Sequence, residues 1–369
     1  MAILNAEKLA RIRKHRYRCE GREVLFILDP GFDKITECLP RFISPNGLTI
    51  VGILSTTIPC ILVSYFEHIG NRQGVQDMSS WCALGFFMWL LCDSIDGKVA
   101  RLRNLSSPFG ELLDHGGDCF ALMLSSMTIA CLLRVSETHE VFFMWFFVDL
   151  FANYISEPYT MYICGKYQYA SFDFLAVVTA FTCISLVSAI YGLDFWTYNI
   201  VPAVNFQFRH IFYIVKIVII ADILLVKSRE LYNTVKGLRE PKMQAVKPLI
   251  PLLVVTLSTV VAFCCCSSEF FQSNSILFLL CFGFSFVKIH IQLLLAQMVK
   301  SQIKIFDYAL LFPIFVSFGI IFCETPKMEK NFIQIFSIIT ALDTTIYFFR
   351  LVYEFYRGLY VENVEDPRK

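Results

Sequence analysis

The chain has 369 residues, of which 56% are hydrophobic and 17% are charged, and its mean hydropathy is +0.59. A soluble globular domain has far fewer apolar residues, and the formal net charge of +1 gives no basic surface of the kind that binds nucleic acid. Composition therefore excludes a soluble nucleic-acid-binding protein. It predicts an all-α protein that crosses a membrane several times.

The first predicted element is an amphipathic helix on the membrane surface. In the stretch DPGFDKITECLPRFISPNGLT (residues 29–49), apolar side chains recur at helical spacing between charged ones. Such a segment lies in the interface between lipid and water. We expect residues 1–46 to form a cytoplasmic and interfacial segment, which either anchors the N-terminus or walls the mouth of a site.

Apolar windows of about 20 residues, the length that crosses a bilayer as a helix, follow this segment. About ten spans are predicted, centred on residues 48–66, 81–102, 112–133, 141–162, 174–193, 211–226, 248–266, 276–298, 306–323 and 332–353. Together they form one integral membrane domain over residues 47–355. Residues 356–369 are left as a polar tail.

Lys and Arg residues gather in every second connection, as the positive-inside rule requires of cytoplasmic segments. Those predicted on the opposite side are few: Arg72, Arg134, Arg209, Lys327 and Lys330. We therefore expect both termini, and the connection between the second and third spans, to face the cytoplasm.

The stretch that includes this connection and the adjoining span ends, DSIDGKVARLRNLSSPFGELLDHGGD (residues 93–118), carries most of the residues that indicate a chemical function. Asp93 and Asp96 share one face of a helix, and Asp114 and Asp118 share one face of the next. Two helices joined by a short loop lie antiparallel, so the four aspartates are expected to converge. Mutual repulsion would raise their proton affinity, and hard divalent cations such as Mg²⁺ or Mn²⁺ would relieve it.

Small and cationic residues stand between these aspartates. Gly97, Ala100 and Gly110 leave room for a ligand, while Lys98, Arg101 and Arg103 supply donors for phosphate oxygens. Carboxylates that hold metal beside cations that hold phosphate predict a phosphoryl-transfer site.

The spacing Asp93-x2-Asp96-Gly97-x2-Ala100-Arg101-x8-Gly110-x3-Asp114-x3-Asp118 resembles the signature of the CDP-alcohol phosphotransferase family at every fixed position. The surrounding sequences SPNGLT (44–49), NLSSPFGELLDHG (104–116) and AQMVKS (296–301) resemble its eukaryotic choline/ethanolamine branch. One departure is Gly117 in DHGGDCF, where the branch usually has another residue.

The resemblance implies a reaction. A phosphoalcohol would pass from CDP-ethanolamine or CDP-choline to the hydroxyl of diacylglycerol, a membrane lipid, and CMP would be released. It also implies a homodimer in endoplasmic reticulum or Golgi membranes. The choice between ethanolamine and choline stays open.

The resemblance further implies a role for each motif residue. Two divalent ions would be held by Asp93, Asp96 and Asp114, with Asp118 completing the site. Gly97, Ala100, Arg101 and Gly110 would line the nucleotide site, with Asn46 nearby.

The acceptor hydroxyl must lose a proton as it attacks phosphorus. His115 is the first candidate for the base, with Glu111 one helical turn before it as the carboxylate that orients the imidazole. Asp118 is the alternative base. Two other functions stay open: the same chemistry on another alcohol or acceptor, such as inositol, and a membrane transporter. A transporter predicts charges near the membrane midplane and internal repeats, whereas these charges cluster at one end of the spans.

Overall fold

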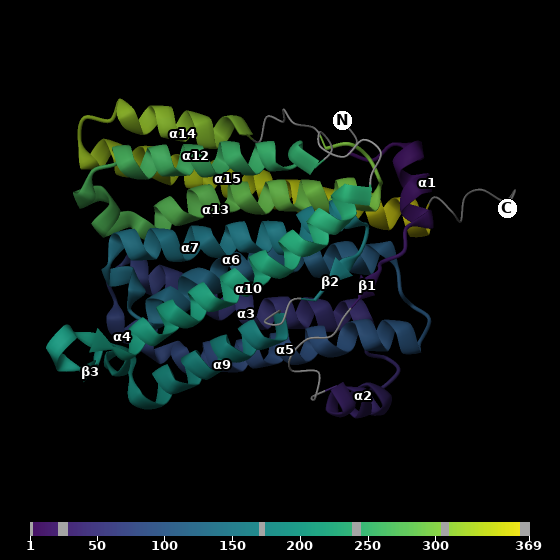
Figure 1. The fold of residues 1–369 in the computed structure, drawn as a ribbon, viewed down its shortest axis with the longest axis horizontal. Helices are drawn as coiled ribbons and strands as arrows, with labels where there is room; N and C mark the ends of the chain where they lie inside the picture. The colour runs from purple at the N-terminus through teal and green to yellow at the C-terminus, as the bar shows by residue number, and fades with distance from the viewer. Residues whose placement is uncertain (1–2, 21–28, 170–173, 238–244, 304–309, 362–369) are drawn as a thin grey trace, which may run out of the picture.

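The computed structural model describes residues 3–20, 29–169, 174–237, 245–303 and 310–361. It confirms the all-α class (Figure 1). The helices are α1 (Ala6–Lys14), α2 (Asp29–Cys38), α3 (Pro45–His68), α4 (Arg72–Asp77), α5 (Ser79–Leu102), α6 (Pro108–Leu132), α7 (His139–Tyr154), α8 (Thr160–Cys164), α9 (Phe174–Tyr191), α10 (Phe208–Gly237), α12 (Leu249–Cys265), α13 (Ser268–Met298), α14 (Leu311–Ile321) and α15 (Pro326–Tyr356). The short strands are β1 (Cys19–Glu20), β2 (Tyr167–Gln168), β3 (Asn199–Val201) and β4 (Phe206–Gln207).

The long helices confirm a polytopic membrane protein. Those long and apolar enough to cross a bilayer are Pro45–His68, Arg72–Leu102, Phe174–Tyr191, Ser268–Met298 and Pro326–Val361, and shorter apolar helices cover Leu249–Cys265 and Leu311–Ile321. Helices α6, α7 and α10 coincide with the remaining predicted spans. The first residues of the predicted ninth span lie outside the described residues.

The predicted fourth span is not one continuous α-helix. Helix α7 ends at Tyr154, a π-helical turn follows at Ile155–Tyr159, and α8 then begins. Pro158 lies inside this turn, and proline has no N–H to donate to the preceding turn, so regular α-helical bonding is interrupted there.

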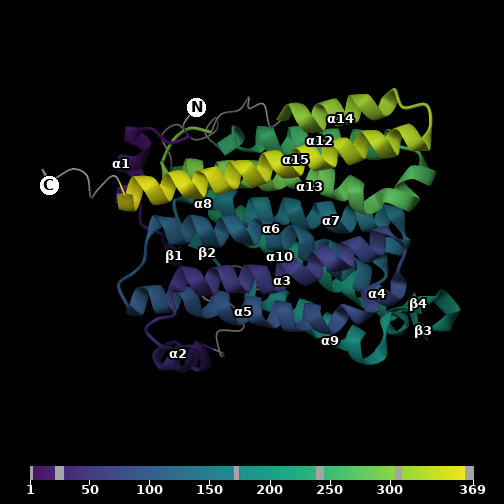
Figure 2. The ribbon, with the colours of Figure 1, turned by 180° about the vertical axis from the view of Figure 1, so that it is seen from behind.

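The bundle has two sides that meet along α6 and α7. Helices α12, α13, α14 and α15 form one side, and α3, α5 and α9 the other (Figures 1 and 2). On the second side, α3 packs extensively on α5 and α6, and α5 packs on α9. Helix α2 and the paired strands β1 and β2 lie at one end of the bundle, and β3 lies at the opposite end.

Helix α2 is amphipathic, as predicted. Phe32 of α2, together with Leu39 and Ile43 just after it, packs against a small apolar cluster of α3 and α5. Ile35 and Phe42 point outward, with 41% and 87% of their surface exposed. Asp29 and Phe32 line a cavity that also contains the motif residues, which supports the expectation that this segment walls the mouth of a site.

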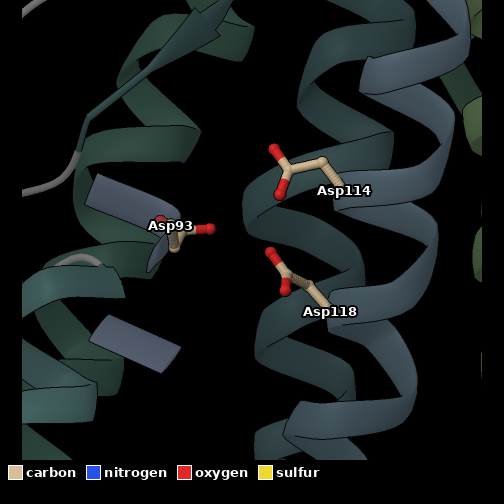
Figure 3. Close-up of side chains that lie close together, drawn as sticks. All are labelled: Asp93, Asp114 and Asp118. Atoms are coloured by element: carbon tan, nitrogen blue, oxygen red, sulfur yellow. The ribbon is translucent and has the colours of Figure 1, made fainter. Parts of the chain in front are cut away.

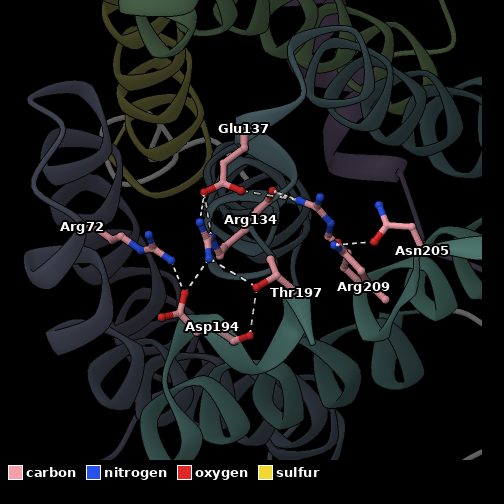
Figure 4. A network of polar contacts seen from close by, with 8 residues as sticks. Arg72, Arg134, Glu137, Asp194, Thr197, Asn205 and Arg209 are labelled. Atoms are coloured by element: carbon pink, nitrogen blue, oxygen red, sulfur yellow. Dashed lines mark hydrogen bonds and ion pairs between the residues drawn. The ribbon is translucent and has the colours of Figure 1, made fainter. Parts of the chain in front are cut away.

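A network of ion pairs closes the end of the bundle opposite α2 (Figure 4). Arg134 contacts Asp194 (Nη1 to Oδ1, 2.5 Å) and Glu137 (Nε to Oε1, 2.7 Å). Arg72 also pairs with Asp194, and the Arg209 guanidinium lies 3.7 Å from Glu137 Oε2. Three of the five cations that the charge distribution assigns to this side are therefore neutralised by carboxylates.

The close approach of α3 and α5 depends on Gly85. A Cβ atom at this position would collide with the carbonyl oxygen of Ser55 on α3. We expect Gly85→Ala to lower the free energy of unfolding by about 1–3 kcal/mol, because a rigid backbone atom must move to admit the methyl group. Heating the purified protein with a thiol-reactive dye, which labels the buried cysteines as the bundle opens, measures the effect.

The matched control is Gly31→Ala in α2, where an added Cβ meets nothing within 4 Å. Its unfolding temperature should stay at or above that of the parent protein. Equal unfolding temperatures for the two variants would contradict the packing argument.

Candidate active site

Three aspartates converge between α5 and α6. Asp93 on α5 and Asp114 and Asp118 on α6 each offer a carboxylate oxygen, and these atoms lie within 4.8 Å of one another. Figure 3 shows Asp93 directed across the gap toward the two α6 side chains. The start of α6 sets this geometry: Ser107 caps the helix by accepting a hydrogen bond from Gly110 N (3.1 Å), and Pro108 is its first residue.

Asp96 lies one turn further along α5 than Asp93 and is outside this group. Its carboxylate accepts a hydrogen bond from the Thr49 hydroxyl of α3, and its surface is 6% exposed. The structure thus places three of the four predicted aspartates together, while Asp96 lines the same cavity beside them. A hydroxyl donor satisfies a buried carboxylate, which explains why Asp96 turns toward α3.

The aspartate group suits a divalent cation. Asp114 Oδ1 is buried and has no hydrogen-bond partner among the described residues. A buried carboxylate oxygen without a partner is costly, and a bound cation would remove that cost. All donors in the group are carboxylate oxygens, the ligands that hard cations such as Mg²⁺ and Mn²⁺ prefer.

The carboxylate that contacts His115 belongs to Glu157, not to Glu111. His115 Nδ1 lies 2.8 Å from Glu157 Oε1, whereas the Glu111 carboxylate binds His15 Nε2 at 2.8 Å. The expected pairing of Glu111 with His115 is therefore wrong. Helical spacing allowed that contact, but a buried histidine from the N-terminal segment already occupies Glu111.

Glu157 comes from the π-helical turn between α7 and α8, which carries its carboxylate toward α6. Its other oxygen lies 3.8 Å from His290 Nε2 on α13. In the sequence, Glu157 is an ionisable residue within the predicted span over residues 141–162, a feature that often marks a functional site. Nothing in the sequence linked it to His115, which is 42 residues earlier in the chain.

The residues expected at the nucleotide all line one cavity. They are Asn46, Gly97, Lys98, Ala100, Arg101 and Gly110. Gly110 faces Asn46, since an added Cβ would lie 3.2 Å from the Asn46 side-chain oxygen. Lys98 binds Asp29 and Asp33 of α2 at 3.0 and 2.7 Å. Arg103 donates to backbone carbonyls just after α2. Arg101 lines the cavity and forms no ion pair with a carboxylate among the described residues.

This cavity, of about 760 Å³, runs from the aspartates into the bundle. Its mouth is polar and includes Tyr17, whose ring centroid lies 5.3 Å from that of His115. Its deeper wall comes from α6, α7, α9 and α10 and is mostly apolar, with Leu122, Ile129, Phe181, Ile184, Val215 and Ile219. One continuous space thus joins the carboxylates to the apolar interior.

The departure at Gly117 has a packing explanation. An added Cβ at this position would overlap Ile53 Cδ1 of α3. Glycine therefore allows the Ile53 side chain to fill the space beside α6, just behind the aspartate face.

Residues 42–161, which include α3, α5, α6 and the whole aspartate group, match the family model of the CDP-alcohol phosphatidyltransferases. This match bears out the family resemblance of the aspartate motif for the part of the chain that carries it.

Several cholinephosphotransferases match over most of their length. Cholinephosphotransferase 1 from Xenopus laevis is 26% identical over 321 residues, which cover 84% of this chain and 78% of the relative. Cholinephosphotransferase 1 from Homo sapiens is 24% identical over 375 residues, covering 97% and 88%. Ethanolaminephosphotransferase 1 from Pongo abelii is 27% identical over 222 residues, covering 57% and 54%.

The His15–Glu111 pair fastens the N-terminal segment to the site. His15 is 6% exposed and Glu111 is 9% exposed. Removing either partner leaves the other buried without its counterpart, which typically costs several kcal/mol. We expect His15→Ala and Glu111→Ala each to release the segment, seen as faster tryptic cleavage after Arg16 and Arg18.

The control is Glu7→Ala, which removes the exposed Glu7–Arg11 pair (2.6 Å) and should leave the cleavage rate unchanged. In the double variant His15→Ala/Glu111→Ala, the increase should be smaller than the sum of the single effects. Strictly additive effects would show that the two residues do not act as a pair.

Proposed function

We propose that this protein transfers phosphoethanolamine, phosphocholine or both from the CDP-alcohol to the hydroxyl of diacylglycerol, releasing CMP. The observation that carries the proposal is one cavity with a carboxylate cluster at its polar mouth and an apolar wall within the membrane bundle. Such a cavity can hold a water-soluble nucleotide at one end and a lipid at the other. The family-model match over residues 42–161 and the names of the relatives point to the same reaction.

Asp93, Asp114 and Asp118, with Asp96 beside them, are proposed to hold two divalent cations, Mg²⁺ or Mn²⁺. When bound, these cations supply positive charge that stabilises the diphosphate and the leaving CMP. Arg101, Gly97, Ala100, Gly110 and Asn46 would bind the nucleotide. Lys98 would form part of the same wall of the nucleotide site. Its ion pairs with Asp29 and Asp33 also hold α5 against α2.

The chemical step requires a base for the acceptor hydroxyl. As the diacylglycerol oxygen forms its bond to the phosphorus next to the alcohol, the hydroxyl proton passes to His115. The bond from that phosphorus to the oxygen of CMP breaks, and CMP leaves with the electron pair. Glu157 keeps the imidazole oriented and stabilises its protonated form through the contact at Nδ1.

Aromatic side chains at the mouth of the cavity can recognise the headgroup. Tyr17, Tyr167 and Tyr169 line this region, and the face of a tyrosine ring attracts an ammonium group. One of these rings already faces a cation, since the amine of Lys227 lies 4.4 Å from the Tyr167 ring centroid.

The remaining expectations also belong to this proposal. Residues 47–355 would form the catalytic membrane domain, with both termini and the cavity mouth on the cytoplasmic side, where the nucleotide is available. The distribution of Lys and Arg supports this orientation. A homodimer in endoplasmic reticulum or Golgi membranes follows from the family resemblance alone.

The reaction is tested by headgroup transfer in microsomes from a host without its own enzymes of this kind. Labelled CDP-ethanolamine and CDP-choline are offered separately with dioleoylglycerol and Mg²⁺ or Mn²⁺. We expect label in phospholipid from at least one donor, and its loss in Asp114→Ala or after chelation of the metal. Asp77→Ala, which changes an exposed aspartate, should keep full activity.

Well-expressed protein that transfers neither headgroup would exclude this reaction. Other CDP-alcohols and acceptors, beginning with inositol as the acceptor alcohol, would then be examined with the same preparation.

The assignment of the base and its partner is tested by kinetics. We expect His115→Ala to lower kcat by about 100-fold or more, since a general base contributes at least that factor. Glu157→Gln should lower kcat by about tenfold with little change in KM for the CDP-alcohol, because an amide holds the ring but cannot stabilise the imidazolium.

Glu111→Gln discriminates between the two carboxylates. It should leave kcat closer to the parent value than Glu157→Gln does, since Glu111 contacts His15. A fully active His115→Ala would transfer the role of base to Asp118.

A further inference from the structure

An ion pair faces the apolar part of the cavity, away from the aspartate group. Lys216 of α10 lies 2.9 Å from Asp149 Oδ2 of α7 and donates to the Trp145 carbonyl at 2.7 Å. The Ser126 hydroxyl of α6 donates to the same Asp149 oxygen at 2.5 Å. The amine also lies 3.5 Å from the centroid of the Trp145 ring, and all four residues line the cavity.

The position of this pair can be estimated from α6. Ser126 follows Asp118 by eight residues on one helix, which corresponds to about 12 Å at 1.5 Å per residue. A full-length acyl chain spans one leaflet of the bilayer, or about 15 Å. An extended chain whose glycerol end lies at the aspartates would therefore reach the ion pair, whereas a short chain would not.

Contact between a saturated chain and this pair is unfavourable. The Asp149 side chain is 30% exposed although it belongs to the interior of the bundle, and the cavity that it lines accounts for this exposure. Methylene groups that displace water from a carboxylate or an ammonium group offer no hydrogen bond in return. A straight chain that extends past the ion pair therefore binds less favourably, because it removes water from these charged groups.

A bent acyl chain can avoid contact with the ion pair. At the level of the ion pair, α9 and α10 contribute apolar side chains to the cavity, including Ala180, Phe181 and Ile219. A cis double bond near the middle of a chain turns its distal half aside, so that half can lie against these apolar walls. Short chains end before the pair.

We propose that the Lys216–Asp149 pair is a specificity determinant, which makes the enzyme select diacylglycerols with bent or short acyl chains over those with straight, full-length saturated chains. The inference rests on the proposed function, because it concerns the acceptor of that reaction. The pair lies along the path of the chains and takes no part in the chemical step.

The test compares three acceptors at equal mole fraction in mixed micelles: dioleoylglycerol, distearoylglycerol and dioctanoylglycerol. For the parent protein we expect kcat/KM for dioleoylglycerol to exceed that for distearoylglycerol. In Lys216→Met/Asp149→Leu this ratio should fall by about tenfold, since a few poorly accommodated methylene groups are worth about that factor. Transfer to dioctanoylglycerol should be retained.

The matched control removes another buried Lys–Asp pair from the membrane bundle. Lys288 of α13 and Asp343 of α15 form an ion pair, and neither residue is among the described residues that line the cavity. Lys288→Met/Asp343→Leu should keep the parent ratio of dioleoylglycerol to distearoylglycerol. The comparison separates chain selection from a general effect of losing an intramembrane ion pair.

An unchanged ratio in Lys216→Met/Asp149→Leu would overturn the inference while leaving the proposed function intact. Should that variant not fold, as judged by gel filtration, the parent protein still decides: equal kcat/KM for the two long-chain acceptors would overturn it. If the parent protein transfers neither headgroup to any acceptor, the proposed function fails and the inference fails with it.

Discussion

The mutual repulsion of carboxylates inside a membrane bundle is the constraint on which the rest of this structure depends. Asp93, Asp114 and Asp118 lie within 4.8 Å of one another, and Asp114 Oδ1 is buried without a hydrogen-bond partner among the described residues. Such an arrangement is unfavourable unless something outside the polypeptide completes it. The packing of α3, α5 and α6 holds the carboxylates together all the same, because Gly85 and Gly117 allow α3 to approach both other helices closely.

Other acidic groups near the cavity are compensated by the chain itself. Glu111 binds His15, Glu157 binds His115, Asp96 accepts from Thr49 and Asp149 pairs with Lys216. Each partner comes from a different element than the carboxylate that it contacts. These contacts therefore serve two purposes: they lower the cost of burial, and they fix the N-terminal segment, the π-helical turn and α10 around one space.

The cavity combines two environments that a transfer between a nucleotide and a lipid requires. Its mouth carries carboxylates, cations and tyrosines, while its interior is formed by apolar residues of the membrane helices. The fourth predicted span contributes to both environments. Helix α7 lines the apolar part, and the π-helical turn at Ile155–Tyr159 that follows it carries Glu157, which contacts His115 at the polar part.

The sequence by itself determined the membrane class, the helices and the aspartate motif. Hydropathy over some 20 residues and a spacing of three or four residues are local properties, so the ten apolar segments and the shared face of Asp114 and Asp118 could be read from them. Only the tertiary structure decided which side chains meet across elements: Glu157 rather than Glu111 beside His115, His15 on Glu111, and Asp96 turned toward Thr49. Pairings of this kind depend on how helices pack and on where a helix breaks. The partners are tens of positions apart, and the sequence around each of them carries no local signal of the other.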